Sequence, residues 1–260
     1  MNEKTPPTSR PRHGHSRKPR LGQHILTDRS VLKTILRVAE LSQEDRLVEI
    51  GAGTGILTAA AAPFVKHITA LEIDDRLCER LREKLKGIPN LTIINADALT
   101  FHYEKLGAPL KVIGNLPYYI ATPILMRLVQ LKGSISDMTL MLQEEVARRL
   151  TASPGKKEYG ALTIKLQYYA NVEKHLTVHP RSFFPPPKVD SAIVKVTFPK
   201  SPRPAPRDEK LFLKVVEAAF AHRRKTVKNS LTAALHPPLS EGQIEAALHC
   251  AGINPRLRGE

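Results

Sequence analysis

Apolar and polar residues alternate in blocks over residues 29–143, and the blocks predict a series of strands and helices. Between Arg29 and Leu41 the apolar residues recur at helical spacing, and Asp28 can cap the helix that they form. Further helices are expected after the glycines near residue 55, over Asp75–Lys86 and over Ala121–Leu131. Short apolar runs between them predict strands: RLVEI, HITALEI, LTIIN, LKVIG and DMTLML. This order predicts an α/β fold with a parallel, doubly wound sheet covered by helices on both faces.

The pattern changes after about residue 150. TASPGKKEYG predicts a loop, and HLTVHP and AIVKVTF predict two short strands. Residues 199–207 hold four prolines in nine residues and predict a stiff linker. EKLFLKVVEAAFAHRR and LSEGQIEAALHCAG predict the helices of a small basic domain. We therefore expect a disordered basic arm at residues 1–20, a main domain at residues 21–198, this linker, and a helical domain at residues 208–260.

Positive charge gathers at two places in the chain, whose formal net charge is +15. Residues 1–20 carry six Lys/Arg against one acid, and residues 181–230 carry twelve against four. A polyanion is the commonest partner of so basic a protein. A solvated, solubilising surface is the alternative explanation of the charge alone.

The sequence gives no support to membrane insertion, secretion or metal chemistry. The longest apolar block, ILTAAAAPFV, is far too short to span a bilayer, and the N-terminal residues lack the apolar core of a secretory signal. Cys78 and Cys250 stand alone without ligand-like spacing, so neither a disulfide framework nor a zinc site is expected. We expect a cytoplasmic protein with no membrane contact and no metal.

A glycine-rich turn and two acids follow three successive predicted strands. VEIGAGTGILT places Gly51 and Gly53 between a strand and a helix, where backbone can approach a ligand closely. Glu72 ends the second strand, where a carboxylate can accept from ribose hydroxyls, and Asp97 follows the third, where it can bind an adenine amino group. One alternative is that both acids only cap helices. Another is that the turn binds a nicotinamide cofactor. No hydride-transfer site is evident, and S-adenosylmethionine also gives a role to Asp97, the acid after the third strand. The pattern therefore favours S-adenosylmethionine.

The stretch GNLPYY places a polar group at the end of the fourth predicted strand, beside the same crevice. The amino nitrogen of adenine is a poor nucleophile because its lone pair is delocalised into the ring. The Asn115 side-chain oxygen and the Leu116 carbonyl, which is restricted by Pro117, can accept its two hydrogens and stabilise the charge that grows on nitrogen. Tyr118 offers a face on which an extruded base can stack. The alternative is an ordinary turn.

Together these stretches resemble the ribosomal RNA adenine N6,N6-dimethyltransferase family, in its small-subunit branch. The resemblance covers residues 19 to about 258 through PRLGQHILTD, VEIGAGTGILT, LEID, NADAL, GNLPYYI, SFFPPPKVDSAIVKV and AFAHRRKTVKNSL. It implies a Rossmann-like, class I S-adenosylmethionine-dependent methyltransferase domain followed by a small helical domain. It also implies dimethylation of two adjacent adenosines near the 3′ end of small-subunit (16S) ribosomal RNA, with a role in small-subunit biogenesis.

The resemblance assigns roles to residues that spacing alone does not. It implies cofactor contacts from Gln23, His24, Leu26, Gly51, Glu72, Asp97 and Asn115, and a base-binding role for Phe183. Phe184 is the substitute if the loop register differs. In two places the chain departs from the family, because His24 and Tyr119 stand where asparagine is common.

The C-terminal basic cluster predicts contacts with RNA. HRRKTVKNS gathers Arg223, Arg224, Lys225 and Lys228, and Arg181, Lys188 and Lys195 lie nearby in the sequence. Such side chains can follow phosphates without reading bases. With aromatic residues at only 5%, recognition of RNA shape is favoured over stacking along many bases. The expected partner is small-subunit RNA or the immature 30S subunit, bound by a monomer.

Three other functions remain open from the sequence. The large-subunit ribosomal RNA methyltransferases of the macrolide-resistance type share the fold and chemistry. A non-catalytic ribosome-assembly or transcription factor on this fold is a different class, although GAGTG and Asn115 are both intact. A DNA adenine methylase is disfavoured because no second target-reading domain is evident.

Overall fold

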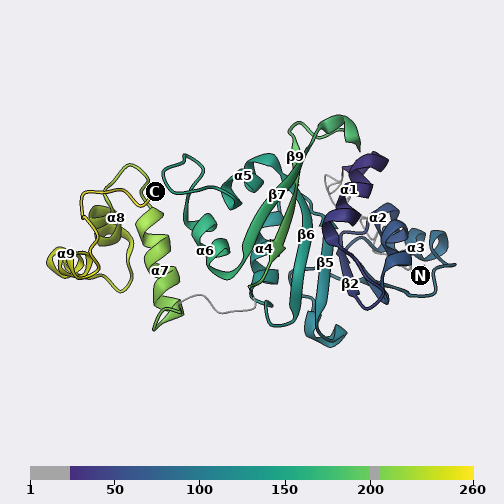
Figure 1. Cartoon of the computed structure of the whole chain (residues 1–260), viewed down its shortest axis with the longest axis horizontal. Helices are drawn as coiled ribbons and strands as arrows, with labels where there is room; N and C mark the ends of the chain where they lie inside the picture. Colours follow the sequence, from purple (N-terminus) through teal and green to yellow (C-terminus); the bar gives the residue numbers. More distant parts are fainter. Residues whose placement is uncertain (1–23, 200–204) are drawn as a thin grey trace, which may run out of the picture.

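The computed structural model describes residues 24–199 and 205–260, so the predicted arm, Gln23 and part of the predicted linker lie outside the described residues. The main sheet has seven strands. In spatial order they are β4 (Leu91–Asn95), β3 (His67–Glu72), β2 (Arg46–Ile50), β5 (Leu110–Asn115), β6 (Ile135–Gln143), β9 (Ser191–Thr197) and β7 (Asn171–Val178) (Figure 1). Strands β4 to β6 are parallel, and β9 is antiparallel to β6 and β7. The predicted α/β sheet is confirmed, with the two late strands forming an antiparallel edge.

Helices cover this sheet on both faces. They are α1 (Arg29–Ala39), α2 (Ile56–Ala61), α3 (Asp75–Lys84), α4 (Ala121–Val129), α5 (Glu144–Leu150) and α6 (Ala161–Tyr169), with short 3₁₀ turns η1 (Ala62–Phe64) and η2 (Tyr103–Leu106). The Asp28 carboxylate accepts from the N–H groups of Ser30 and Val31, which confirms the predicted cap of α1. Helix α6 was not predicted, because its apolar residues fall on all sides of the helix and leave no periodic stripe.

Successive residues of one strand enter different hydrophobic cores. Val112 packs in a cluster with residues of α4 and α6, whereas Ile113 packs with residues of α1 and α2. Because side chains alternate along a strand, the adjacent apolar residues Val112 and Ile113 are what a strand buried on both faces requires.

A second, two-stranded sheet brings the first described residues beside a loop that lies far away in sequence. Strand β1 (Ile25–Leu26) pairs antiparallel with β8 (Phe183–Phe184), which follows the turn η3 (Pro180–Ser182). The Thr27 N–H donates to the Ser182 carbonyl at 2.8 Å, and the Ser182 hydroxyl donates to the Asp28 carboxylate at 3.0 Å. The cap of α1 therefore also fixes this small sheet.

Three C-terminal helices form their own hydrophobic cluster. They are α7 (Glu209–Phe220), α8 (Val227–Ala234) and α9 (Glu241–Cys250), and they lie at one end of the molecule (Figure 1). The helix predicted to continue to Arg224 ends at Phe220, and Thr226 caps α8 instead. The predicted division into domains at residues 21–198 and 208–260 stays a prediction, which the separate cluster supports. Across residues 24–199 and 205–260, no helix combines the length and apolar character needed to cross a membrane.

Gly114 allows the close approach of β5 to β2. A Cβ atom there would lie 2.8 Å from the Ile50 carbonyl oxygen, which is backbone and cannot yield. We expect Gly114→Ala to lower the free energy of unfolding by about 1–3 kcal/mol, as overpacking does. Urea unfolding followed by circular dichroism measures the change. Gly133→Ala is the matched control, because its added Cβ meets nothing within 4 Å; equal losses in both variants would contradict the steric explanation.

Candidate active site

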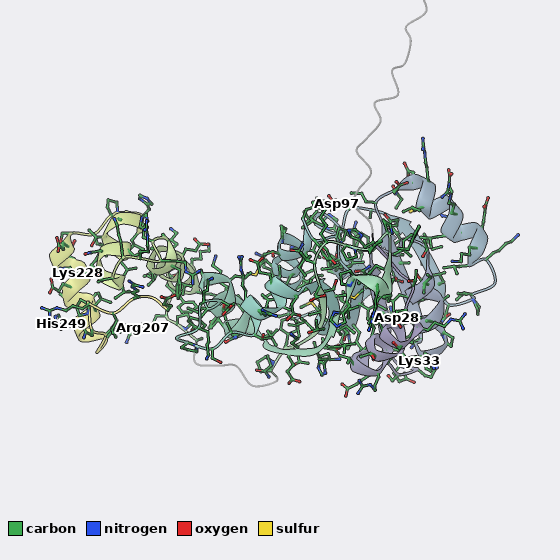
Figure 2. All side chains as sticks on the ribbon, turned by 90° about the horizontal axis from the view of Figure 1, so that it is seen from above. Asp28, Lys33, Asp97, Arg207, Lys228 and His249 are labelled. Carbon is green, nitrogen blue, oxygen red and sulfur yellow. The ribbon has the colours of Figure 1, made fainter. Side chains whose placement is uncertain are left out.

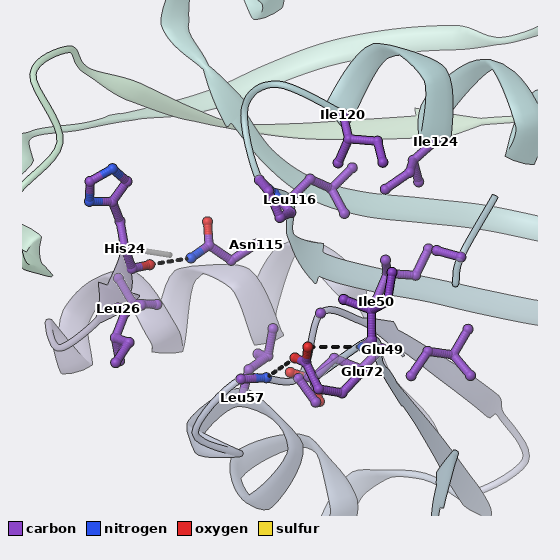
Figure 3. A pocket seen from close by; sticks show the side chains of 18 of the residues that line it. His24, Leu26, Glu49, Ile50, Leu57, Glu72, Asn115, Leu116, Ile120 and Ile124 are labelled. Atoms are coloured by element: carbon purple, nitrogen blue, oxygen red, sulfur yellow. Dashed lines mark hydrogen bonds between the residues drawn. The ribbon is translucent and has the colours of Figure 1, made fainter. Parts of the chain in front are cut away.

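A crevice opens where the strand order reverses, at the carboxyl ends of β2 and β5. In an open α/β sheet this position binds ligands. The crevice is lined by residues 24–26, 49–54, 71–73, 96–98 and 115–120, with Ile35, Ile56, Leu57 and Ile124 (Figure 3). The glycine turn, both predicted acids and the NLPYY stretch therefore meet in one place, as the sequence predicted.

The glycine turn takes a backbone shape that side chains oppose. Gly51, Gly53 and Gly55 have φ values of 72°, 54° and 74°. The N–H groups of Gly51 and Ala52 donate to the Leu71 carbonyl at 2.9 and 3.2 Å, which ties the turn to the end of β3.

Glu72 holds the turn from the opposite side. Its buried carboxylate accepts from the N–H of Gly53 at 2.9 Å and from the N–H groups of Ile73 and Asp74 at 2.9 and 3.1 Å. The alternative that Glu72 merely caps a helix is wrong, because Asp74 caps α3. Three N–H donors leave part of the carboxylate's accepting capacity for a ligand.

Asp97 is bound less completely. One of its carboxylate oxygens accepts from the Leu99 N–H at 2.8 Å, so it stabilises the turn after β4. It lines the crevice nonetheless, close to the apolar residues Ile73 and Ala98. The arrangement suits a flat base with a polar edge.

Glu49 is a crevice residue that the sequence analysis missed. It is only 2% exposed, and the Thr58 hydroxyl donates to its carboxylate at 2.5 Å. Burial raises the pKa of Glu49 to about 8 despite this hydrogen bond, and the neighbouring Glu72 adds to the rise. The sequence did offer a signal for Glu49, because it is a single acid within the apolar run of a strand that is buried on both faces.

The Asn115 carboxamide has a fixed orientation. Its Nδ2 donates to the His24 carbonyl at 2.8 Å, and a carbonyl can only accept, so the amide nitrogen must face it. The Asn115 oxygen consequently turns away from His24 at the crevice (Figure 3). Among the described residues, no group donates to the carbonyl of the next residue, Leu116. Two oxygens thus stand free at this edge.

Tyr118 is anchored and Tyr119 is not. The Tyr118 hydroxyl shares a 2.6 Å hydrogen bond with the hydroxyl of Ser191, which is fully buried at the start of β9. Burial raises the pKa of the Tyr118 phenol. The His24 ring lies 5.8 Å from the Tyr118 ring, and its Nδ1 lies 2.7 Å from the Pro185 carbonyl oxygen. Tyr119 lines the crevice with 64% of its surface exposed.

The structure does not bring Phe183 into the crevice lining. Phe183 is 4% exposed and packs in the core, because its position opposite Leu26 in the small sheet turns it toward the same buried face. Phe184, opposite Ile25, is 70% exposed. The base-binding role implied for Phe183 therefore stays a prediction, because the ring is buried in the core. Leu26 and His24 lie at the crevice as predicted.

The basic residues fall into three environments. Arg224, Lys225 and Lys188 are exposed. Arg223 donates to the Lys157 carbonyl and pairs with Glu260, and Lys228 pairs with Glu241 at 2.7 Å and Glu245 at 3.3 Å. Lys228 lies in the C-terminal helices, at the end of the molecule remote from Asp28 (Figure 2).

Lys195, by contrast, does not face solvent. It is 7% exposed, and its ammonium group donates to the Asp137 carboxylate at 2.7 Å and to the Val38 carbonyl at 3.0 Å. The suggestion that it follows RNA phosphates is wrong, because the lysine neutralises the half-buried Asp137 and the carbonyl end of α1. Within the described residues, no cluster of metal-ligating side chains is present.

Comparisons with known proteins add to this geometry. A family model described as "Ribosomal RNA adenine dimethylase" matches residues 14–256. A "Ribosomal RNA small subunit methyltransferase A" of Clostridium botulinum (strain Okra) is 42% identical over 243 residues, which cover 92% of this chain and 87% of that protein. The protein of that name from Streptococcus sanguinis is 40% identical over 257 residues, covering 96% and 89%.

Two solved structures share the fold over nearly the whole chain. The crystal structure of a dimethyladenosine transferase from Plasmodium falciparum superposes with a TM-score of 0.77 at 27% identity, covering 91% of this chain and 92% of that one. The 23S rRNA methyltransferase ErmE superposes with a TM-score of 0.71 at 31% identity, covering 90% and 93%. The Rossmann-like, class I methyltransferase fold is confirmed.

The raised pKa of Glu49 predicts a specific dependence of stability on pH. A folded pKa of about 8 against an ordinary value of 4.5 means that the folded protein holds a proton that the unfolded chain releases. This contribution is complete below pH 4.5 and is lost as the pH rises through 8, with an upper bound of roughly 5 kcal/mol. We expect Glu49→Gln, which keeps an oxygen for Thr58, to remove this fall. Urea unfolding of both proteins between pH 5 and 9 measures the difference; parallel profiles would refute it.

Proposed function

We propose, since the chain belongs to the ribosomal RNA adenine dimethylase family, that it dimethylates the N6 amino groups of two adjacent adenosines near the 3′ end of small-subunit (16S) ribosomal RNA. The chain is an S-adenosylmethionine-dependent methyltransferase by family and by fold. The observation that carries the proposal is the Asn115 carboxamide, whose oxygen faces a crevice built from the glycine turn and acidic strand ends. We place the reaction in the cytoplasm and assign it to the monomer.

The side chains of the crevice suit S-adenosylmethionine. Glu72 offers its remaining accepting capacity to ribose hydroxyls, and Asp97 offers its second oxygen to the adenine amino group. The carboxylates of Glu72 and Asp97 line a crevice in a protein of net charge +15, and they favour a cationic ligand locally. When bound, the cofactor supplies a methyl group on a positively charged sulfur.

Asn115 and Leu116 activate the target nitrogen. The side-chain oxygen of Asn115 and the Leu116 carbonyl each accept one amino hydrogen, which favours the tetrahedral nitrogen of the transition state. The nitrogen lone pair becomes available to the methyl carbon that the cofactor would supply, and the electron pair of the broken carbon–sulfur bond would stay on sulfur as a neutral thioether. The nitrogen, positively charged after the transfer, would then lose a proton to water, so no strong general base is required.

Aromatic side chains hold the target base. Tyr118 presents its ring at the crevice, and its hydroxyl is fixed by Ser191. We retain Phe183 as the second base-binding residue; this role requires its ring to leave the core, since Leu26 covers the same face. Phe184 is the exposed substitute one position along.

The basic C-terminal helices bind RNA in this proposal. Arg223, Arg224 and Lys225 occupy the turn between α7 and α8, and Lys188 follows β8, so phosphate contacts extend along the molecule. Lys228 contributes less, because two glutamates already neutralise it.

Large-subunit RNA is the second candidate substrate. The fold similarity to a 23S rRNA methyltransferase favours this second candidate. The relatives at 42% and 40% identity, which carry small-subunit names, argue for the first candidate.

Transfer of a labelled methyl group tests the proposal. We expect the protein to label undermethylated small subunits at two neighbouring adenosines, located by primer extension. Asn115→Ala should lose at least 100-fold in rate, on the scale of removing one transition-state hydrogen-bonding group, and should still bind the subunit. Lost methylation together with retained binding separates this enzyme from a non-catalytic assembly factor, which would transfer no methyl group with or without Asn115→Ala.

The controls for this experiment decide between the substrates. Large subunits assayed in parallel should stay unlabelled, and label confined to them would refute the proposal. Gln43→Ala is a suitable control variant, because Gln43 donates to the Pro63 carbonyl on the surface and lies outside the crevice lining.

Ser191 predicts a positioning effect on Tyr118. Ser191→Ala removes the partner of the phenol and frees the ring, so we expect kcat to fall about 10-fold while RNA binding is unchanged. Ser191→Thr keeps the hydroxyl and should restore most of the activity. The Tyr118→Phe variant should respond much less to Ser191→Ala than the wild type does. Additive losses in the double variant would contradict the positioning role.

A further inference from the structure

Two consecutive tyrosines of the crevice have opposite environments. Tyr118 is tied to Ser191 and lies beside the His24 ring. Tyr119 is 64% exposed, and within residues 24–199 and 205–260 its side chain has neither a hydrogen bond nor a ring partner. An exposed aromatic ring without such partners at the rim of a binding crevice offers a face on which a base can stack.

The substrate itself has two consecutive units. Extruding one base into the crevice breaks its stack with the next base along the strand. The next base remains one nucleotide away, outside the crevice, with one face newly exposed. Exposed bases of single-stranded RNA bind preferentially to aromatic faces.

We propose that Tyr119 binds the nucleobase adjacent to the reacting adenosine and replaces the stacking that extrusion removes. This inference rests on the proposed function and deepens it, because it assigns a site to the nucleotide that is not reacting. Tyr118 and Tyr119 then serve two neighbouring bases, one inside the crevice and one on its rim.

Charge around the rim favours RNA as the occupant. The loop that carries Pro185, whose carbonyl lies against the His24 ring, is flanked by exposed Arg181 and Lys188. Cations on this loop can hold the phosphates on either side of the extruded nucleotide.

Substitution in protein and RNA together tests the proposal. The substrates are small subunits rebuilt with ligated RNA in which one adenosine of the pair can react. In the first RNA, the other adenosine keeps its base but is protected from methylation. In the second RNA, that other position is an abasic nucleotide. On the RNA with both bases, we expect Tyr119→Ala to lower kcat/KM by roughly 10-fold, within the range measured for base stacking on aromatic residues. Tyr119→Phe should retain the wild-type value. On the abasic RNA, wild type and Tyr119→Ala should react equally.

The outcomes separate the inference from the proposed function. An equal loss on both RNAs, or no loss on either, would overturn the role of Tyr119 while methylation by the wild type stands. Absence of methylation by the wild type on intact RNA would overturn the proposed function and this inference with it. Phe64→Ala removes an exposed ring, 51% accessible, that lies outside the crevice lining, and it should change neither rate.

Discussion

The proposed methyl transfer depends on one hydrogen bond, from the Asn115 amide to the His24 carbonyl 91 residues earlier in the chain. An amide that rotated freely would present its N–H₂ group to the substrate amine as readily as its oxygen, and would repel it in that orientation. The His24 backbone is held in turn by the pairing of β1 with β8 and by the contact of its ring with Pro185. The smaller sheet therefore sets the direction of the Asn115 oxygen, and it also places Leu26 and Phe183 in the core.

Charge is separated between the two jobs of the molecule. The carboxylates of Glu72 and Asp97 lie at the crevice, where the cationic cofactor binds, whereas no Lys or Arg of the described residues lines it. Because salt screens exposed charges more than buried ones, ionic strength should weaken RNA binding more than cofactor binding. Burial holds a proton on Glu49, so this third acid adds little negative charge to the crevice at neutral pH.

Features set by neighbouring residues could be predicted from the sequence, and features set by distant ones could not. The Asp28 cap, the glycine turn and the strand ends that carry Glu72, Asp97 and Asn115 follow from local patterns, so their positions were found. The burial of Lys195 depends on Asp137 of β6 and the end of α1, which the sequence does not place together. Phe183 and Phe184 are adjacent and alike, and only the register with β1 decides which one is buried.

The crevice and the C-terminal helices can act on one RNA only if the distance between them is defined. That distance is set where α6 meets α7. The Tyr169 hydroxyl donates to Glu209, Lys165 pairs with Glu217, and the Tyr168 ring packs 4.8 Å from that of Phe212. Three side-chain contacts on one face of α6 hold α7 against it. In the proposed reaction, a phosphate held by the turn between α7 and α8 would fix which nucleotides can reach Asn115, so RNA shape, rather than base sequence at the crevice, would select the target.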